Sequence, residues 1–124
     1  MKTKTRMIIR EAMQEVDTMK STKPNCVRLN SRNTDAHELL KYLVCRQLNK
    51  EGKTFYTEIV FLNGQRADIF VPEDFKCIEI LGTETREQCL EKTKDYPEAF
   101  EIVMVDSKRI KMLGKFKWDD KLIY

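Results

Sequence analysis

Two acidic residues interrupt runs of apolar residues that otherwise have the character of buried strands. Asp68 lies within RADIFV (residues 66–71), and Glu79 lies within KCIEIL (residues 76–81). A carboxylate inside a buried sheet is costly unless it is paired, protonated or bound to a cation. Oxygen ligands favour Mg²⁺ or Mn²⁺, which activates water and polarises a phosphoryl group. We therefore expect Asp68 and Glu79 to bind a metal ion together; the alternative is that Asp68 pairs with Arg66 and that Glu79 lies at a solvated strand end.

Alternating apolar patterns around both acids predict strands. Asn63-Gly64, the strongest short hairpin signal, is expected to join the first two strands. Thr85 and Gln88 fit a capping box for a helix over residues 86–95. The strand after this helix is expected to run parallel to the one before it, because a helix crosses between them. The expected strands are 55–62, 66–71, 75–81 and 100–105.

Elsewhere the apolar residues recur with helical spacing. The clearest helix is predicted over residues 35–49, with Thr34 as its cap. Residues 3–20 are expected to form an amphipathic helix, and Pro24 and the Asn/Ser cluster make 21–33 a linker. The predicted fold is a single α/β domain with a mixed four-stranded central sheet, in the order αβββαβ, flanked by helices. Its expected parts are an N-terminal arm and linker (1–33), an α/β core (34–106) and a basic C-terminal tail with a short helix (107–124).

The motifs in the core resemble those of a known group of enzymes. Arg66-Ala67-Asp68 follows the Asn-Gly turn, and Ile78-Glu79-Ile80-Leu81 forms the next strand. With the order of elements over residues 35–105, these motifs are similar to the PD-(D/E)xK nuclease superfamily, which includes restriction endonucleases and archaeal Holliday junction resolvases. The resemblance implies a metal-dependent DNA phosphodiesterase, with Asp68 and Glu79 as the ligands of Mg²⁺ or Mn²⁺.

The chain departs from this superfamily at Leu81. The superfamily usually has a lysine, sometimes Gln or Glu, two residues after the second acid. If the protein is catalytically active, a residue other than Leu81 must supply the positive charge of this lysine. Arg66 is the first choice because it shares a strand face with Asp68, and Gln88 and Lys92 lie one turn apart on the following helix. The alternative is a catalytically inactive nucleic-acid-binding or assembly protein on the same fold.

A third acid is expected from one of two positions. Glu38 lies on the helix 35–49, where resolvase-like members of the superfamily carry an acid. Glu58 is the other candidate, from the first strand. A two-residue turn pairs Ile59 with Asp68 and sends Glu58 to the opposite face. A three-residue loop with a bulge brings Glu58 to the face of Asp68.

The net charge of +3 is unevenly distributed. Residues 1–33 carry eight Lys/Arg and three Asp/Glu, residues 34–106 carry nine and fifteen, and residues 107–124 carry six and two. One interpretation of this distribution is that the charges simply form an ordinary solvated surface. The functional one is an acidic, metal-binding centre with basic ends that contact the phosphates of nucleic acid. The resemblance to the nuclease superfamily implies that this nucleic acid is DNA rather than RNA.

Composition excludes several classes of protein. No apolar run exceeds four residues, so we expect no membrane span, and no signal-peptide core follows the start, so we expect an intracellular, cytoplasmic protein. Four scattered cysteines and a single histidine, His37, argue against a zinc site, and His37 is expected at the helix border. The apolar stripe of the arm predicts a possible homodimer. Outside nucleic acids, the remaining hypothesis is a small adaptor that docks a partner through this arm.

Overall fold

The computed structural model describes residues 2–21 and 23–106. The predictions of a basic tail and of a short helix at its start fall on residues 107–124 and lie outside the described part. The helices and strands are α1 (Thr3–Met13), α2 (Asp35–Lys50), β1 (Tyr56–Val60), β2 (Arg66–Val71), the short 3-10 helix η1 (Pro72–Asp74), β3 (Lys76–Leu81), α3 (Arg86–Thr93) and β4 (Glu101–Asp106).

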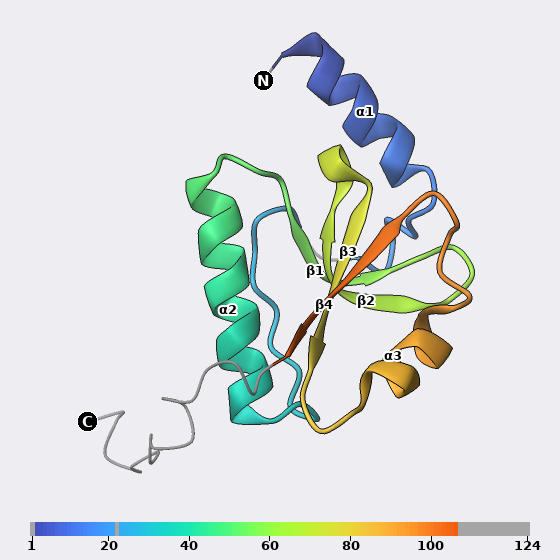
Figure 1. The fold of residues 1–124 in the computed structure, drawn as a ribbon. Coiled ribbons are helices and arrows are strands. Elements are labelled where there is room, and N and C mark those ends of the chain that lie inside the picture. The colour runs from blue at the N-terminus through green and yellow to red at the C-terminus, as the bar shows by residue number, and fades with distance from the viewer. Residues whose placement is uncertain (1, 22, 107–124) are drawn as a thin grey trace.

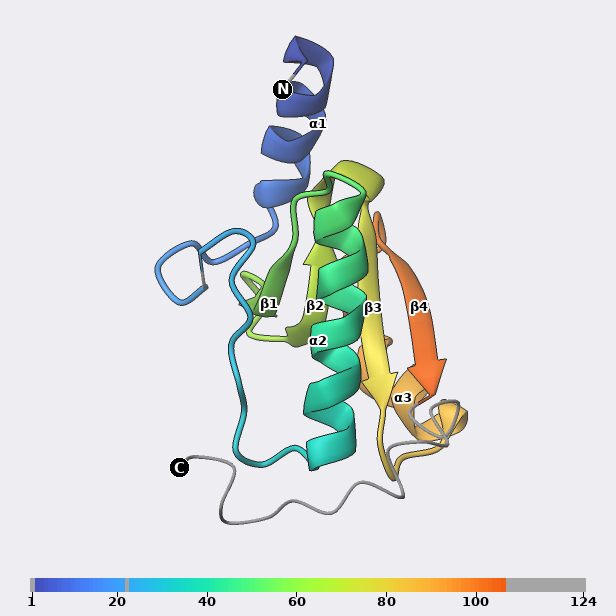
Figure 2. The same ribbon diagram turned by 90° about the vertical axis from the view of Figure 1, so that its left-hand side faces the viewer.

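The four strands form one mixed sheet in the order β1-β2-β3-β4. The first three strands are antiparallel neighbours, and β4 runs parallel to β3, with Ile78 level with Val103. The expectation of an α/β fold with a mixed four-stranded sheet is therefore confirmed. The long α2 covers one face, α3 lies against the other, and α1 extends beyond the end of the sheet (Figures 1 and 2).

Each face of the sheet carries its own apolar core. On the α2 face, Leu40 and Cys45 pack with Ile69, Val71, Ile78 and Ile80 of the sheet. On the other face, aromatic residues meet edge to face, with Phe61 and Phe70 having ring centroids 5.7 Å apart. The two cores hold β2 and β3 rigidly in register, so these strands fix the positions of the two strand acids.

The hairpin between β1 and β2 has the three-residue loop rather than the two-residue turn. The Phe61 N–H donates to the Gln65 carbonyl at 2.8 Å, and Ile59 pairs with Ala67. Of the two alternatives, the two-residue turn that would pair Ile59 with Asp68 is therefore wrong, and the shift of register by one residue is confirmed. Glu58 has a left-handed φ of 51° and is skipped by the ladder. This break in the strand turns Glu58 toward α2, where its carboxylate lies 3.5 Å from Lys41 Nζ.

Helix α1 ends earlier than its apolar pattern predicts. The expected helix ran to residue 20, whereas α1 stops at Met13. Beyond it, Val16 forms a bridge with Phe61, and the Asp17 N–H donates to the Val60 carbonyl at 2.9 Å. The chain leaves the helix here because its backbone pairs with the end of β1.

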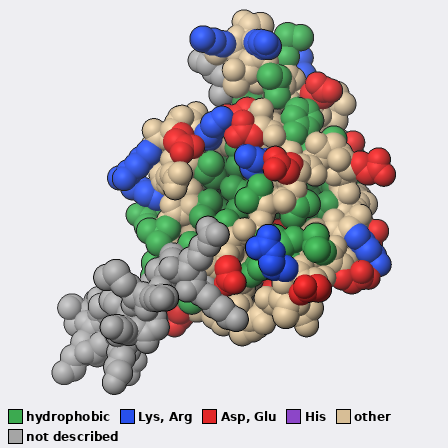
Figure 3. Space-filling model, viewed as in Figure 1, with side chains coloured by type: hydrophobic (Ala, Val, Ile, Leu, Met, Phe, Trp, Pro, Cys, Tyr) green, Lys and Arg blue, Asp and Glu red, His purple; other side chains and the backbone are tan. Residues whose placement is uncertain are grey.

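One surface of the domain is markedly apolar. Figure 3 shows patches of hydrophobic side chains on the face that carries α2 and β4, with charged side chains among and around them. A groove in this region is lined by Leu40, Leu43, Val44, Gln47, Leu48 and Val105. Within the described ranges, no helix is long and apolar enough to cross a lipid bilayer.

Candidate functional site

Asp68 lies in the middle of β2 and leaves the regular strand ladder. Its Oδ2 accepts a hydrogen bond from the Ile80 N–H at 2.9 Å and lies 3.3 Å from His37 Nε2 on α2. Burial acts to raise the pKa of this carboxyl, but the hydrogen bonds from His37 and Ile80 outweigh it and hold the pKa below its usual value. Asp68 is therefore ionised at neutral pH although only 14% of its side chain is exposed.

Glu79 lies beside Asp68 on β3 and is completely buried. The Tyr96 hydroxyl contacts its Oε1, and its carboxyl interacts with that of Asp68, whereas its Oε2 is buried with no other hydrogen-bond partner among the described residues. Burial, together with the negative charge of Asp68, raises the pKa of Glu79 to about 9. The two acids thus form a pair in which Asp68 is charged and Glu79 holds a proton.

The hydrogen bonds of Tyr96 agree with a protonated Glu79. The single hydroxyl proton of Tyr96 faces two acceptors, the Arg66 carbonyl at 2.5 Å and Glu79 Oε1. If Glu79 is protonated at Oε1, it donates to Tyr96 and Tyr96 donates to the carbonyl, so the hydroxyl and the carbonyl are both paired. Proton loss from Glu79 leaves a buried charge beside Asp68, which a cation would neutralise.

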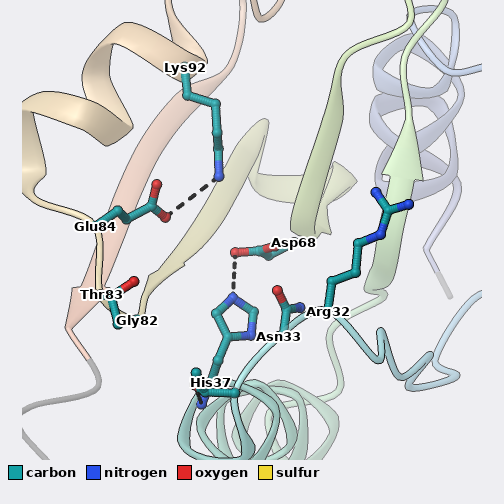
Figure 4. Close-up of a pocket in the computed structure, with 9 residues that line it drawn as sticks. Arg32, Asn33, His37, Asp68, Gly82, Thr83, Glu84 and Lys92 are labelled. Carbon is teal, nitrogen blue, oxygen red and sulfur yellow. Dashed lines mark hydrogen bonds and ion pairs between the residues drawn. The ribbon is translucent and has the colours of Figure 1, made fainter.

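A pocket of about 290 Å³ is lined by Asp68, whereas the completely buried Glu79 is not among its lining residues. We call it the acid pocket. Lys92 reaches into it from α3, with its Nζ 3.6 Å from Glu84 and 3.9 Å from Glu79 Oε2. Figure 4 shows Lys92, Asp68 and His37 converging from α3, β2 and α2. The acid pocket is lined by Arg32, Asn33, Thr34, His37, Asp68, Gly82, Thr83, Glu84 and Lys92.

His37 bridges two carboxylates at the start of α2. Thr34 caps this helix by accepting from the His37 N–H, and the imidazole contacts Glu38 Oε1 at 3.0 Å as well as Asp68. Burial acts to lower the pKa of His37, but the two carboxylates outweigh it and raise the pKa. A protonated imidazole donates to both acids. Beyond the cap, no sequence pattern indicates this bridge, because Asp68 is distant along the chain.

Glu38 anchors the linker rather than lining the acid pocket. Its oxygens accept from the Asn30 N–H at 2.9 Å, from Asn33 Nδ2 at 2.8 Å and from Lys41 Nζ at 2.9 Å. Burial acts to raise its pKa, but the hydrogen bonds outweigh it and lower the pKa. The structure thus places Glu38 in contact with His37, and His37 lies between Glu38 and Asp68.

The remaining candidates lie around this centre. Arg66 is exposed and, with Glu58, lines a second pocket next to the acid pocket. Gln88 is occupied in the predicted capping box, where it accepts from the Thr85 N–H at 2.8 Å. Leu81 is only 2% exposed, so its side chain belongs to the core. Of the residues expected to supply the positive charge that is missing at Leu81, the structure brings Lys92 closest to the acid pair.

Replacing Glu79 by glutamine should remove most of the pH dependence of stability of the metal-free protein. The pKa of Glu79 rises from 4.5 in the unfolded chain to about 9 in the folded one. Because the pKa of Glu79 is higher in the folded protein than in the unfolded chain, Glu79 makes its full contribution to the free energy of unfolding below pH 4.5. This contribution is lost as the pH rises toward 9. Urea unfolding in EDTA should show wild type losing on the order of several kcal/mol over this range, and Glu79→Gln losing much less.

The difference between the two proteins isolates Glu79, because His37 and Asp68 titrate in both. Parallel curves of unfolding free energy against pH for wild type and Glu79→Gln would show that Glu79 is already ionised in the folded protein. The paired-acid description of the site would then be wrong.

A search among the described residues finds no group of three or more His, Cys, Asp or Glu side chains that could hold a metal ion. The acid pair therefore provides at most two protein ligands of this kind. Comparison with known proteins adds nothing to the geometry: no family model matches the chain, and no curated protein or solved structure matches it.

Proposed function

We propose that this protein is a metal-dependent phosphodiesterase that acts on nucleic acid, DNA rather than RNA. One observation carries the proposal: the carboxyl groups of Asp68 and Glu79 interact from neighbouring strands, and Glu79 Oε2 is buried with no other hydrogen-bond partner among the described residues. A native structure rarely leaves a buried polar atom unpaired. A divalent cation shared by the two carboxylates would satisfy this atom.

The side chains present fit Mg²⁺ or Mn²⁺. Both ions prefer oxygen ligands, and Mg²⁺ is commonly held by one or two carboxylates, with water and substrate phosphate completing its shell. Asp68 and Glu79 would supply the two carboxylates. The bound cation would polarise a phosphoryl group and activate water.

Lys92 fits the role that the superfamily gives to a lysine in the position of Leu81. Its ammonium lies 3.9 Å from Glu79 Oε2, and 46% of its side chain is exposed to the acid pocket and solvent. A fixed positive charge there stabilises negative charge developing on a phosphate. Arg32 and Asn33 line the same pocket and would position the substrate.

A second candidate function is nucleic-acid binding without catalysis. The contacts of Asp68 favour it, because His37 and the Ile80 N–H already satisfy this carboxylate without a cation.

The possible homodimer also stays a prediction. It is supported by the arm, where Met7 is 67% and Met19 93% exposed.

One assay separates the two functions. Wild-type protein is incubated with single strands, duplexes, flaps and junctions, with Mn²⁺ or with EDTA. The phosphodiesterase predicts cleavage of at least one substrate that requires the metal. Binding of these DNAs without any cleavage would leave only the second candidate.

A further inference from the structure

A second pocket, of about 420 Å³, lies next to the acid pocket. We call it the arginine pocket. Arg28 and Arg32 reach it from the linker before α2, and Arg66 from the first position of β2. Arg32 lines both pockets, so the two are adjacent. The full lining of the arginine pocket is Arg28, Leu29, Asn30, Ser31, Arg32, Glu58 and Arg66.

The three guanidinium groups have no protein partner in the part of the chain that the structure describes. Arg28, Arg32 and Arg66 are all exposed, and none of their guanidinium groups makes an ion pair or hydrogen bond with a described residue. Each carries up to five N–H donors in a planar fork that matches the geometry of phosphate oxygens. Three unpaired forks around one cavity are suited to an oxyanion.

The linker that carries two of these arginines is held by buried groups. The Arg28 N–H donates to Thr57 Oγ1 at 2.8 Å, and the Arg28 carbonyl accepts from the fully buried Lys41 at 2.8 Å. Further along, the Asn30 N–H donates to Glu38 Oε2 at 2.9 Å. The backbone under Arg28 and Arg32 is therefore preorganised, which lowers the entropy lost on binding.

The charge balance of the arginine pocket also favours an anion. Among its seven lining residues, Glu58 is the one acid. Its carboxylate lies 3.5 Å from Lys41 Nζ, a cation that the pocket lining does not include. The three arginines thus exceed the acid by two positive charges, before the buried lysine is counted.

We propose that the arginine pocket binds a backbone phosphate of the nucleic-acid strand whose neighbouring phosphodiester enters the acid pocket. The identity of this ligand rests on the proposed function. Arg32 would contact the strand between the two pockets, and Arg28 and Arg66 would hold the phosphate beyond it. In this arrangement Arg66 contributes to binding rather than to the chemical step.

The test measures binding of a fluorescein-labelled single-stranded DNA by anisotropy in EDTA, where no metal-dependent cleavage occurs. Arg28→Ala and Arg66→Ala should each lower affinity about tenfold. Each should also reduce the slope of log affinity against log salt by about 0.7 per lost phosphate contact. Arg46→Ala removes an exposed arginine of α2 that lines neither pocket, and should change neither quantity.

A second arm identifies the source of the phosphate. Inorganic phosphate is titrated into wild type and the Arg28→Ala/Arg66→Ala double variant by calorimetry, with circular dichroism to verify folding. Weakened DNA binding in the variants supports the proposal. Unchanged DNA binding overturns it, and phosphate binding that is nevertheless lost in the double variant would assign the pocket to a small phosphorylated ligand.

The outcome is independent of catalysis. If the variants lose DNA binding but wild type never cleaves DNA, the phosphodiesterase proposal fails and the arginine pocket stands. If wild type cleaves DNA and the variants bind it normally, the arginine pocket fails and the phosphodiesterase stands.

Discussion

Asp68→Asn should lower the rate of Mn²⁺-dependent DNA cleavage by about a thousandfold. The amide oxygen can still accept from the Ile80 N–H, so the local backbone is retained. The negative charge that would hold the cation is lost. Single-turnover rates on the best wild-type substrate measure this effect.

The matched control is Asp74→Asn. Asp74 is an exposed acid whose carboxylate pairs with Lys53 at 3.0 Å, outside both pockets. It should cleave at the wild-type rate. If Asp68→Asn and Asp74→Asn cleave equally fast, Asp68 has no part in the reaction and the acid pair is structural only.

Lys92→Ala should lower the cleavage rate by about a hundredfold. The substitution removes the ammonium group that lines the acid pocket close to Glu79, while the rest of α3 keeps its capping box. Because the lysine is argued to act on charge that develops in the reaction, the loss should appear in the maximal rate more than in DNA affinity.

Lys94→Ala is the control on the same segment. Lys94 is exposed and pairs with Glu91 at 2.5 Å, away from the acid pocket. A normal rate in Lys92→Ala would contradict its role. If Arg66→Ala instead loses the maximal rate with unchanged DNA affinity, the charge comes from Arg66, as the strand pattern first suggested.

The strands were predictable because each is a short and largely apolar run. The sheet residues around Asp68 and Glu79 carry this pattern, and the capping box of Thr85 and Gln88 marks the start of α3 correctly. The end of α1 was not predictable from helical spacing. It depends on the pairing of Val16 with Phe61, a contact between segments far apart in sequence.

The site was only partly predictable for the same reason. Asp68 and Glu79 stand out because a carboxylate is costly in a buried strand, and that argument needs no tertiary contact. The approach of Lys92 depends on how α3 packs on the sheet, and the bridge from His37 depends on α2. The contacts of Glu38 run to a linker that has no regular pattern at all.

Calorimetric titration of Mn²⁺ into the metal-free full chain tests the central claim most directly. A cation shared by the acid pair predicts that wild type binds Mn²⁺, and that Asp68→Asn and Glu79→Gln each weaken binding about tenfold or more. Asp74→Asn should bind like wild type. Equal Mn²⁺ affinity in all four proteins would contradict the account, because Asp68 and Glu79 would then not be the ligands.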